Sequence, residues 1–136
     1  MPNVPVPQPE SEFYWSKARE GELWFRHCNV CRKAYFYPRD ICPACFSRDT
    51  TWIRSSGRGW LYSFAIVHRP PNDAWRDLVP YVVAIVELEE GVRMPTNLIG
   101  VEPDPRSIRV GMPVIVKFKA VSEQIAIPVF EPLAAE

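Results

Sequence analysis

Four cysteines constrain what this chain can fold into more than any other feature of its sequence. Cys28 and Cys31 form one Cys-x-x-Cys pair, Cys42 and Cys45 form a second, and the chain has no other cysteine. Two residues between thiols allow a tight turn to point both sulfurs at one spot, so two such turns bring four sulfurs together. Four thiolates in a tetrahedron are a ligand set that structural zinc favours. The spacing therefore predicts a zinc ribbon that uses all four cysteines as ligands.

Redox-active cysteine pairs and an iron site are the alternatives to zinc. A cytosolic chain has little use for structural disulfides, which favours a metal. Rubredoxin-type iron sites share this spacing, but glycine usually follows the second cysteine of each pair there, whereas Arg32 and Phe46 follow here. We therefore favour zinc over iron. His27 precedes Cys28 and is not needed as a ligand, because four cysteines are present.

Five basic residues lie close to the cysteines in the sequence. One interpretation is a patch that binds anions or phosphates. The other, which we favour, is compensation of the negative charge that zinc carries when four thiolates bind it. Both can hold together. The five residues are Arg26, Arg32, Lys33, Arg39 and Arg48.

The sequence contains no recognisable set of catalytic residues. Metal binding leaves no cysteine as a nucleophile, and the two histidines, His27 and His68, have no partner in a Gly-x-Ser-x-Gly or similar arrangement. Scattered carboxylates leave acid–base catalysis open. Nothing in the pattern predicts an active site that is complete within this chain.

The segment before the ribbon combines a proline-rich start with a short aromatic helix. Residues 1–9 contain four prolines, which predicts an extended arm. Residues 10–20 open with acidic side chains and end with basic ones, as a helix does. Phe13, Tyr14 and Trp15 are consecutive and sweep roughly 200° of that helix at about 100° per residue. At least one of these rings faces away from the ribbon, where either another surface of the chain or a docked partner covers it.

The rest of the chain predicts a small β-barrel. Short strand-like runs alternate with turn signals, and helical periodicity is absent except for a turn near residues 105–108. Five short antiparallel strands in about 80 residues favour an OB-fold. The fold class is therefore mainly β, with a short N-terminal helix, a rubredoxin-like zinc ribbon and a five-stranded OB-fold barrel. The predicted parts are an arm and docking helix at 1–22, the ribbon at 23–50 and the OB-fold domain at 51–136.

The longest irregular segment predicted in the barrel domain spans residues 69–79. Long loops in compact domains often carry function. An aromatic ring and several arginines can hold a nucleotide, the ring by stacking and the cations by charge. The alternative is an ordinary exposed loop whose tryptophan packs back on the barrel. The side chains concerned are Arg69, Trp75 and Arg76, beside a barrel face with Tyr81 and Arg93.

The charge balance argues against nucleic acid as the main partner. The chain has 16 basic and 16 acidic residues, and residues 51–136 alone have nine basic and ten acidic ones. A nucleic-acid-binding protein needs a basic surplus. The longest apolar run, residues 81–86, is too short to span a bilayer, so no membrane contact is expected. The sequence opens without a secretory signal pattern, and we therefore expect the cytoplasm as the compartment.

Taken in order, these motifs resemble one known family. A helix with consecutive aromatics precedes Leu-x-Phe-x-x-Cys-x-x-Cys at residues 23–31, and Tyr-Pro-Arg-Asp-Ile-Cys-Pro-Ala-Cys follows at 37–45. Gly-Trp-Leu-Tyr-Ser-Phe at 59–64 and Gly-Met-Pro-Val at 111–114 lie in the barrel. This order resembles the two-domain zinc-ribbon/OB-fold proteins that accompany thiolase-fold enzymes. The family was long filed as a domain of unknown function and as nucleic-acid-binding proteins.

The resemblance implies an accessory subunit without catalytic residues of its own. Such proteins bind thiolases, thiolase-like aldolases or acyltransferases that make or break carbon–carbon bonds on acyl-CoA, in β-oxidation and in the degradation of lipids or aromatic compounds. Some are fused or bound to hotdog-fold enoyl-CoA hydratases. The resemblance also implies a hetero-oligomer with two copies of each chain. CoA or acyl-CoA would be a ligand shared with the partner.

The resemblance also nominates contact residues. The OB-fold domain in the family lies against the partner near the CoA entrance, so the implied acyl-CoA or interface contacts are Arg69, Trp75, Tyr81 and Arg93. Phe13, Tyr14 and Trp15 are the candidates for partner docking. Two other functions stay open from the sequence: a binder of single-stranded nucleic acid, because ribbons and OB-folds both do this, and a rubredoxin-like electron carrier.

Overall fold

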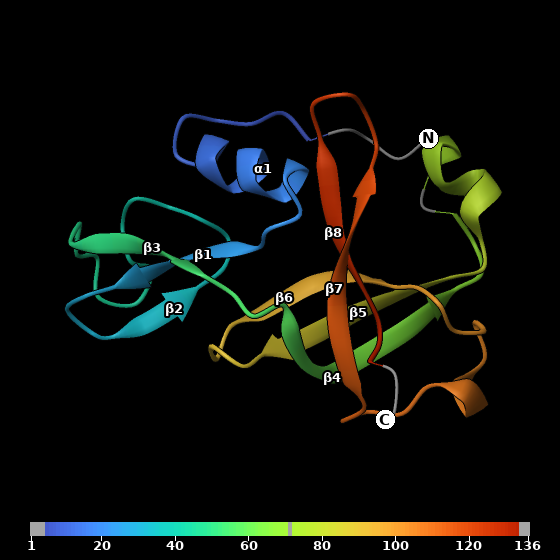
Figure 1. Ribbon diagram of the computed structural model, residues 1–136. Coiled ribbons are helices and arrows are strands. Elements are labelled where there is room, and N and C mark those ends of the chain that lie inside the picture. Colours follow the sequence, from blue (N-terminus) through green and yellow to red (C-terminus); the bar gives the residue numbers. More distant parts are fainter. Residues whose placement is uncertain (1–4, 71, 134–136) are drawn as a thin grey trace.

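The protein consists of a small ribbon and a barrel that lie side by side. The computed structural model describes residues 5–70 and 72–133, with Ala74 and Trp75 described by their backbone alone. In Figure 1 the ribbon lies on the left, the barrel lies on the right, and helix α1 (Glu12–Arg19) lies above their junction. Within the described residues no helix has the length and apolar character needed to cross a bilayer.

The ribbon is a three-stranded antiparallel sheet. β1 (Trp24–Cys28) is its central strand, between β2 (Lys33–Tyr35) and β3 (Thr50–Arg54). On these neighbours Tyr35 and Trp52 lie opposite Arg26. The sequence analysis placed residues 51–54 in the second domain, and the structure corrects this assignment. After the second cysteine pair the chain runs back alongside β1. Residues 51–54 therefore belong to the ribbon sheet, and the barrel begins after them.

The barrel has the five strands and the closure of an OB-fold. Its strand order is β4-β5-β6-β8-β7, and β7 closes the barrel by pairing with β4. All neighbours are antiparallel except β6 and β8, which are joined in parallel through Leu98 and Phe130. The prediction of an OB-fold is thus confirmed. The strands are β4 (Arg58–Val67), β5 (Tyr81–Leu88), β6 (Arg93–Leu98), β7 (Pro113–Ala120) and β8 (Ala126–Pro132).

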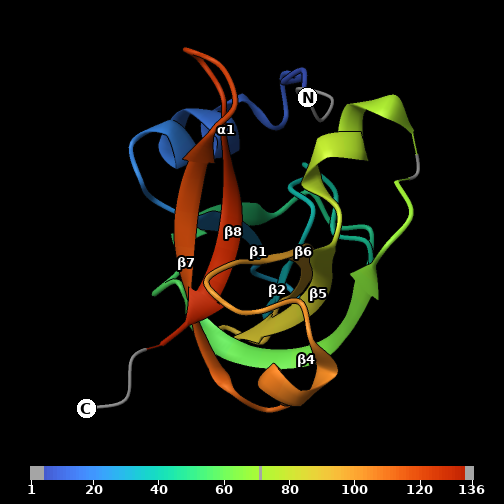
Figure 2. The same ribbon diagram turned by 90° about the vertical axis from the view of Figure 1, so that its right-hand side faces the viewer.

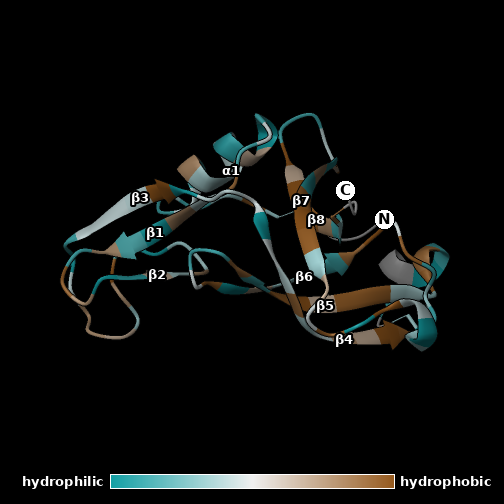
Figure 3. Cartoon of the chain, turned by 60° about the horizontal axis from the view of Figure 1, so that its bottom comes forward, coloured by the Kyte–Doolittle hydropathy of each residue, from teal (hydrophilic) through white to brown (hydrophobic). Residues whose placement is uncertain are grey.

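Strand β5 carries apolar side chains on both of its faces. Val82, Ala84 and Val86 point into the barrel and are buried, as alternation along a strand requires. Val83 and Ile85 point outward and remain 36% and 39% exposed. Figure 3 shows β5 coloured as hydrophobic along most of its length. The outer face of β5 is therefore an apolar surface that this chain covers only in part.

Helix α1 joins the two parts into one hydrophobic core. Tyr14 and Trp15 are 1% and 8% exposed, and Trp15 Nε1 donates a hydrogen bond of 2.8 Å to the hydroxyl of Tyr37. The same cluster of buried residues includes Phe25 from the ribbon and Phe130 from the barrel. Burial of one large apolar side chain contributes about 1.5–3 kcal/mol, so this shared core fixes the position of the ribbon against the barrel.

The two long connections of the barrel each contain a short 3-10 helix. The segment 69–79, expected to be irregular, contains η1 (Asp73–Leu78), which lies above β4 and β5 in Figure 2. The turn expected near residues 105–108 is confirmed as η2 (Pro105–Ser107). The carboxylate of Asp104 caps η2 by accepting a hydrogen bond of 2.9 Å from the backbone N–H of Arg106.

Candidate metal centre and adjoining surfaces

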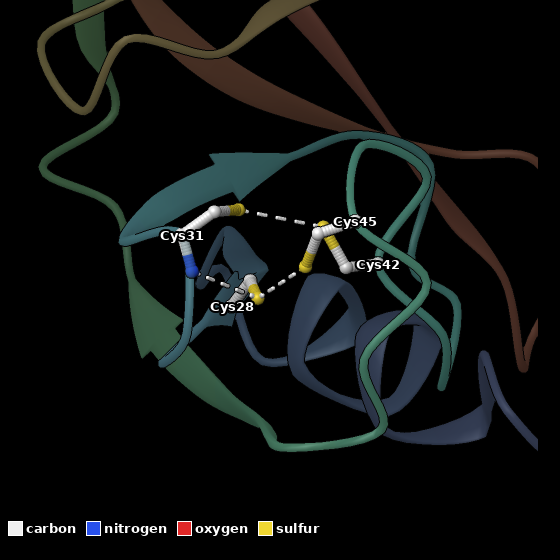
Figure 4. Close-up of side chains that lie close together, drawn as sticks. All are labelled: Cys28, Cys31, Cys42 and Cys45. Carbon is white, nitrogen blue, oxygen red and sulfur yellow. Dashed lines mark hydrogen bonds between the residues drawn. The ribbon is translucent and has the colours of Figure 1, made fainter.

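The four cysteine sulfurs converge at the end of the ribbon. Their Sγ atoms all lie within 4.8 Å of one another. Sulfur contacts cross between the two pairs, with Cys28 at 3.5 Å from Cys45 and Cys31 at 3.6 Å from Cys42 (Figure 4). A tetrahedron with zinc–sulfur bonds of about 2.3 Å has sulfur–sulfur edges of about 3.8 Å. The spacing of the sulfurs fits a single zinc ion held by all four cysteines.

Each cysteine pair forms the same turn. Arg32 donates its backbone N–H to the carbonyl of Cys28, and Phe46 donates in the same way to Cys42, both at 2.8 Å. The two donors also share a left-handed backbone, with φ of 59° for Arg32 and 64° for Phe46. Residues with a Cβ rarely adopt this conformation. The two turns, called knuckles below, thus hold bulky side chains where glycine fits most easily.

Backbone donors around the sulfurs prepare two of the thiols to lose their protons. The N–H of Cys31 lies 3.4 Å from Sγ of Cys28, and backbone N–H groups, led by that of Cys31, hold the pKa of Cys28 below its ordinary value. Backbone N–H groups, led by that of Cys45, lower the pKa of Cys42 to about 6. Burial, by contrast, raises the pKa of Cys31 to about 12. A metal ion supplies the positive charge that lets all four sulfurs bind as thiolates.

Of the five cations near the cysteines, one lies inside the ribbon. Arg26 is half-buried, stacks on Trp52 with its guanidinium carbon 5.0 Å from the ring centroid, and donates to the carbonyl oxygen and the hydroxyl of Thr50. Its positive charge lies near Tyr35, and Tyr35 also interacts electrostatically with Cys42. This placement agrees with compensation of the thiolate charge. The remaining four, Arg32, Lys33, Arg39 and Arg48, are exposed.

A large apolar hollow lies where α1, the ribbon and the barrel meet. It has a volume of about 960 Å³, and among the described residues that line it Lys119 is the only one with a charged side chain. Trp15 and Tyr37 border it on one side, and Tyr81 and Ile85 of β5 border it on another. Lys119 forms no ion pair with any residue that the structure describes. The volume falls within the range of small-molecule sites, about 300–1,000 Å³.

The hollow was not predictable from the sequence. Residues from seven segments line it, and neither spacing nor composition shows which segments meet. The available signal was the continuous apolar run at residues 81–86. A strand that is apolar on both faces is typical of one covered on both faces.

Two family models match consecutive parts of the chain. Residues 15–51 match the rubredoxin-like zinc ribbon domain of ChsH2, and residues 52–119 match its C-terminal OB-fold domain. A DUF35 domain-containing scaffold protein of Methanothermobacter thermautotrophicus is 38% identical over 98 residues, which is 71% of each protein. The chain belongs to the ChsH2/DUF35 family. The resemblance read from the motifs is therefore confirmed.

Two further relatives carry ChsH2/DUF35 sequences in the context of enzymes. A solved structure described as "Ltp2-ChsH2(DUF35) aldolase" contains a chain that is 35% identical, with a TM-score of 0.79 over 94% of this chain and 98% of that one. A protein of Thermomonospora curvata named "Probable enoyl-CoA hydratase alpha subunit" is 37% identical over 123 residues. That match covers 90% of this chain but only 37% of the relative, so the chain spans about a third of its length.

Four residues of this DUF35 chain were nominated as acyl-CoA or interface contacts, and the structure describes the side chains of three of them. Tyr81 lines the hollow, and Arg69 is exposed two residues after β4 ends, near the start of β5. Arg93 lies opposite Glu87, six residues along β5 from Tyr81, which is about 20 Å. The side chain of Trp75 lies outside the described residues. Among the described side chains, Tyr81 and Arg93 therefore do not lie together.

Arg93 is held on the outer face of the barrel by its own neighbours. Its Nε lies 3.1 Å from a carboxylate oxygen of Glu87, and its guanidinium carbon lies 4.0 Å from the centre of the Tyr62 ring. Both contacts are within the chain. The carboxylate offsets the positive charge of the guanidinium, and the Tyr62 ring covers one of its faces. Arg93 itself does not line the hollow, although the next residue on β6, Met94, does.

The aromatic triplet of the helix packs within the chain. Tyr14 and Trp15 are buried in the shared core, and the ring of Phe13 lies 4.7 Å from Trp52 and 5.3 Å from Trp24, measured between centroids. Of the two alternatives that the sequence left open, the structure shows the one in which other surfaces of the same chain cover these rings. Tyr14 and Trp15 hold the ribbon and barrel together.

Proposed function

We propose that the chain is a zinc-containing accessory subunit of a thiolase-fold enzyme that makes or breaks carbon–carbon bonds on acyl-CoA. The observation that carries this proposal is the likeness to the ChsH2(DUF35) chain of the solved aldolase, which extends over 94% of this chain at 35% identity. Likeness over whole chains argues that the surfaces used for assembly are retained. The aldolase activity itself belongs to the named complex.

The chemistry of the metal centre supports a structural rather than a catalytic role for the metal. Zinc bound by four cysteines has no open position for substrate or water, so such a site holds protein segments together. The residues that would hold it are Cys28, Cys31, Cys42 and Cys45. Neither histidine belongs to this cluster: His27 is half-buried on β1 beside Cys28, and His68 is exposed after β4. In this proposal the nucleophile and the general base come from the partner.

The hollow and the adjoining outer face of β5 are the surfaces we assign to the partner and its acyl group. Val83, Ile85 and Ile99 line the hollow and are 36–39% exposed. An apolar surface of this kind is typical of an interface. Tyr81 and Lys119 are polar groups at its border that we propose contact the acyl-CoA, with Arg69 close by. We do not include Arg93 in this proposal, because its guanidinium is paired with Glu87 and packs on Tyr62.

The relative named as a hydratase alpha subunit supports a second partner. Most of that relative lies beyond the part that matches this chain. We propose that a hydratase, present there in the same protein, is a separate chain here and joins the same complex. The subunit would then bring two acyl-CoA enzymes together in the cytoplasm.

Purification of the tagged chain from its native cells, followed by mass spectrometry, tests the proposal. We expect a thiolase-fold protein in equal amount, and a complex mass that corresponds to two copies of each chain. A matched control is the Cys42→Ser, Cys45→Ser double variant, which removes half of the metal ligands and is expected to lose the partner. Recovery of the chain alone, or with nucleic acid, would contradict the proposal.

A further inference from the structure

The residue after each cysteine pair has a left-handed backbone that is unfavourable for a residue with a Cβ. Its side chain is not a ligand of the metal. Phe46 follows Cys45 with φ of 64°, and its side chain is 77% exposed. A left-handed residue with a Cβ is unfavourable, and glycine at this position would form the same turn without that strain. The ring contributes little to packing because most of it faces solvent. A strained, exposed aromatic residue points to a role outside the fold.

The exposed ring has apolar neighbours on the same end of the ribbon. Val30 lies between the two cysteines of the first knuckle and is 61% exposed, and Ile41 precedes the second knuckle and is 36% exposed. Ile41 and Phe46 border a depression of about 350 Å³ together with Arg39 and Arg48. Since the four sulfurs lie within 4.8 Å, both knuckles belong to one surface.

Four exposed cations lie on the same part of the ribbon as these apolar side chains, and the carboxylates of Glu10 and Asp40 also border the depression. Arg32, Lys33, Arg39 and Arg48 are exposed, and none forms an ion pair with a residue in the described part of the chain. Compensation of the thiolates accounts for the sign of this charge. It does not account for the exposed valine, isoleucine and phenylalanine. An exposed apolar centre with mainly cationic neighbours is complementary to an apolar socket bordered by carboxylates.

We infer that this zinc-knuckle tip is a protein-docking surface that inserts Phe46 into an acidic-rimmed apolar socket on the thiolase-fold partner. The tip comprises Val30, Arg32, Lys33, Arg39, Ile41, Phe46 and Arg48. This inference rests on the proposed function for the identity of the partner. It adds a second contact surface, besides the hollow, between the chain and that partner. The tip is at the Cys28 end of β1, whereas the chain leaves for the barrel beside Trp24, and the tip shares no residue with the hollow.

A protein is favoured over nucleic acid as the occupant. Aliphatic side chains such as Val30 and Ile41 offer no ring on which a base can stack, and base stacking is what single-strand binders use. Phosphate contacts also need a basic surplus, which the chain lacks with 16 basic and 16 acidic residues. A central aromatic residue beside arginines is the usual composition of a binding hot spot.

Affinity of the purified chain for its co-purified thiolase-fold partner tests the inference. The variant Phe46→Gly should keep its zinc and its melting temperature yet bind at least about tenfold more weakly. The double variant Arg39→Glu, Arg48→Glu should also bind more weakly, and the affinity of the wild-type chain should fall as salt rises. Val110→Ser, which changes an apolar side chain that is 65% exposed on the barrel domain, is the matched control and should bind like the wild type.

Each other outcome overturns a distinct statement. If the wild-type chain binds the partner and Phe46→Gly binds it equally well, the tip is no docking surface while the proposed function stands. If Phe46→Gly loses zinc or melts at lower temperature, the ring has a structural part and the inference fails. If a single-stranded oligonucleotide binds the wild-type chain and Phe46→Gly abolishes that binding, the occupant is nucleic acid. Failure of the wild-type chain to bind any thiolase-fold protein removes the proposed function and the inference together.

Discussion

At Gly59 on β4 the barrel has no room for a side chain. A Cβ built there would lie 2.2 Å from the backbone carbonyl oxygen of Glu87, an atom that cannot move without disturbing β5. We therefore expect Gly59→Ala to lower the free energy of unfolding by about 1–3 kcal/mol, the usual cost of a steric clash in a packed core. Urea titration of both proteins measures the difference.

Gly91 provides the control for this prediction. It has φ of 88° and no atom within 4 Å of an added Cβ, so Gly91→Ala tests the backbone cost alone. That cost is about 1–2 kcal/mol. A Gly59→Ala variant as stable as the wild type would show that β4 and β5 are farther apart than described here.

Phe46 gives the opposite expectation for stability. Glycine at this position removes left-handed strain of about 1–2 kcal/mol and adds unfolded-state entropy worth about 0.5–1 kcal/mol. The first effect is the larger one, so Phe46→Gly should be as stable as the wild type or up to about 1 kcal/mol more stable when saturated with zinc. Thermal unfolding in the presence of zinc measures this. A clear loss of stability would mean that the exposed ring packs against the knuckle.

At the scale of elements, helix α1 makes the junction sensitive to alkaline pH. Burial raises the pKa of Tyr14 above its ordinary value, and the nearby Tyr37 adds to the effect. Because the folded state disfavours the phenolate, the stability is fully present below the unfolded pKa of about 10 and is lost as the pH rises through the higher folded pKa.

The variant Tyr14→Phe tests this linkage, because it keeps the ring and removes the ionisable hydroxyl. Its free energy of unfolding should fall less steeply above pH of about 10 than that of the wild type. The measurement is the midpoint of denaturant unfolding as a function of pH. Equal slopes for both proteins would show that Tyr14 ionises in the folded state as freely as in the unfolded one.

The ribbon depends on its metal more than the barrel does. The knuckles span residues 28–46, and few large side chains are buried among them. Structural zinc contributes folding free energy directly. We expect a chelator to expose the amides of β2 and of the knuckles to hydrogen exchange while β4 and β5 stay protected. Uniform loss of protection across both parts, or none at all, would contradict this division.

Elements with a local chemical signal were predictable, and those set by tertiary contacts were not. The cysteine spacing predicted the metal centre, and turn residues between apolar runs predicted the barrel. Strand β3 was placed in the wrong part because its partner, β1, is more than twenty positions away in the sequence. The burial of Tyr14 and Trp15 depends on the packing of α1 against the barrel. No local sequence pattern predicts that packing. For the same reason the nominated contacts Tyr81 and Arg93 were not recognised as lying apart, at the start of β5 and opposite its far end on β6.

At the scale of the whole molecule, the two parts are positioned as one unit. The linker between them is fixed by Glu90, whose carboxylate accepts hydrogen bonds from the hydroxyl of Ser55 at 2.7 Å and the N–H of Ser56 at 2.9 Å. Together with the shared core, this holds the zinc-knuckle tip and the hollow at a set separation. Two contact surfaces on one rigid subunit favour binding to a large partner, because the second contact costs little additional entropy.

The central claim is that this chain assists a carbon–carbon bond-forming or bond-cleaving enzyme without catalysing the reaction itself. The most direct measurement is the rate of acyl-CoA cleavage by the co-purified thiolase-fold protein alone, by this chain alone, and by the two together. We expect the chain alone to be inactive and the complex to be at least about tenfold faster than the isolated partner. Cleavage by the chain alone, or a partner whose rate and stability are unchanged by the chain, would contradict the account.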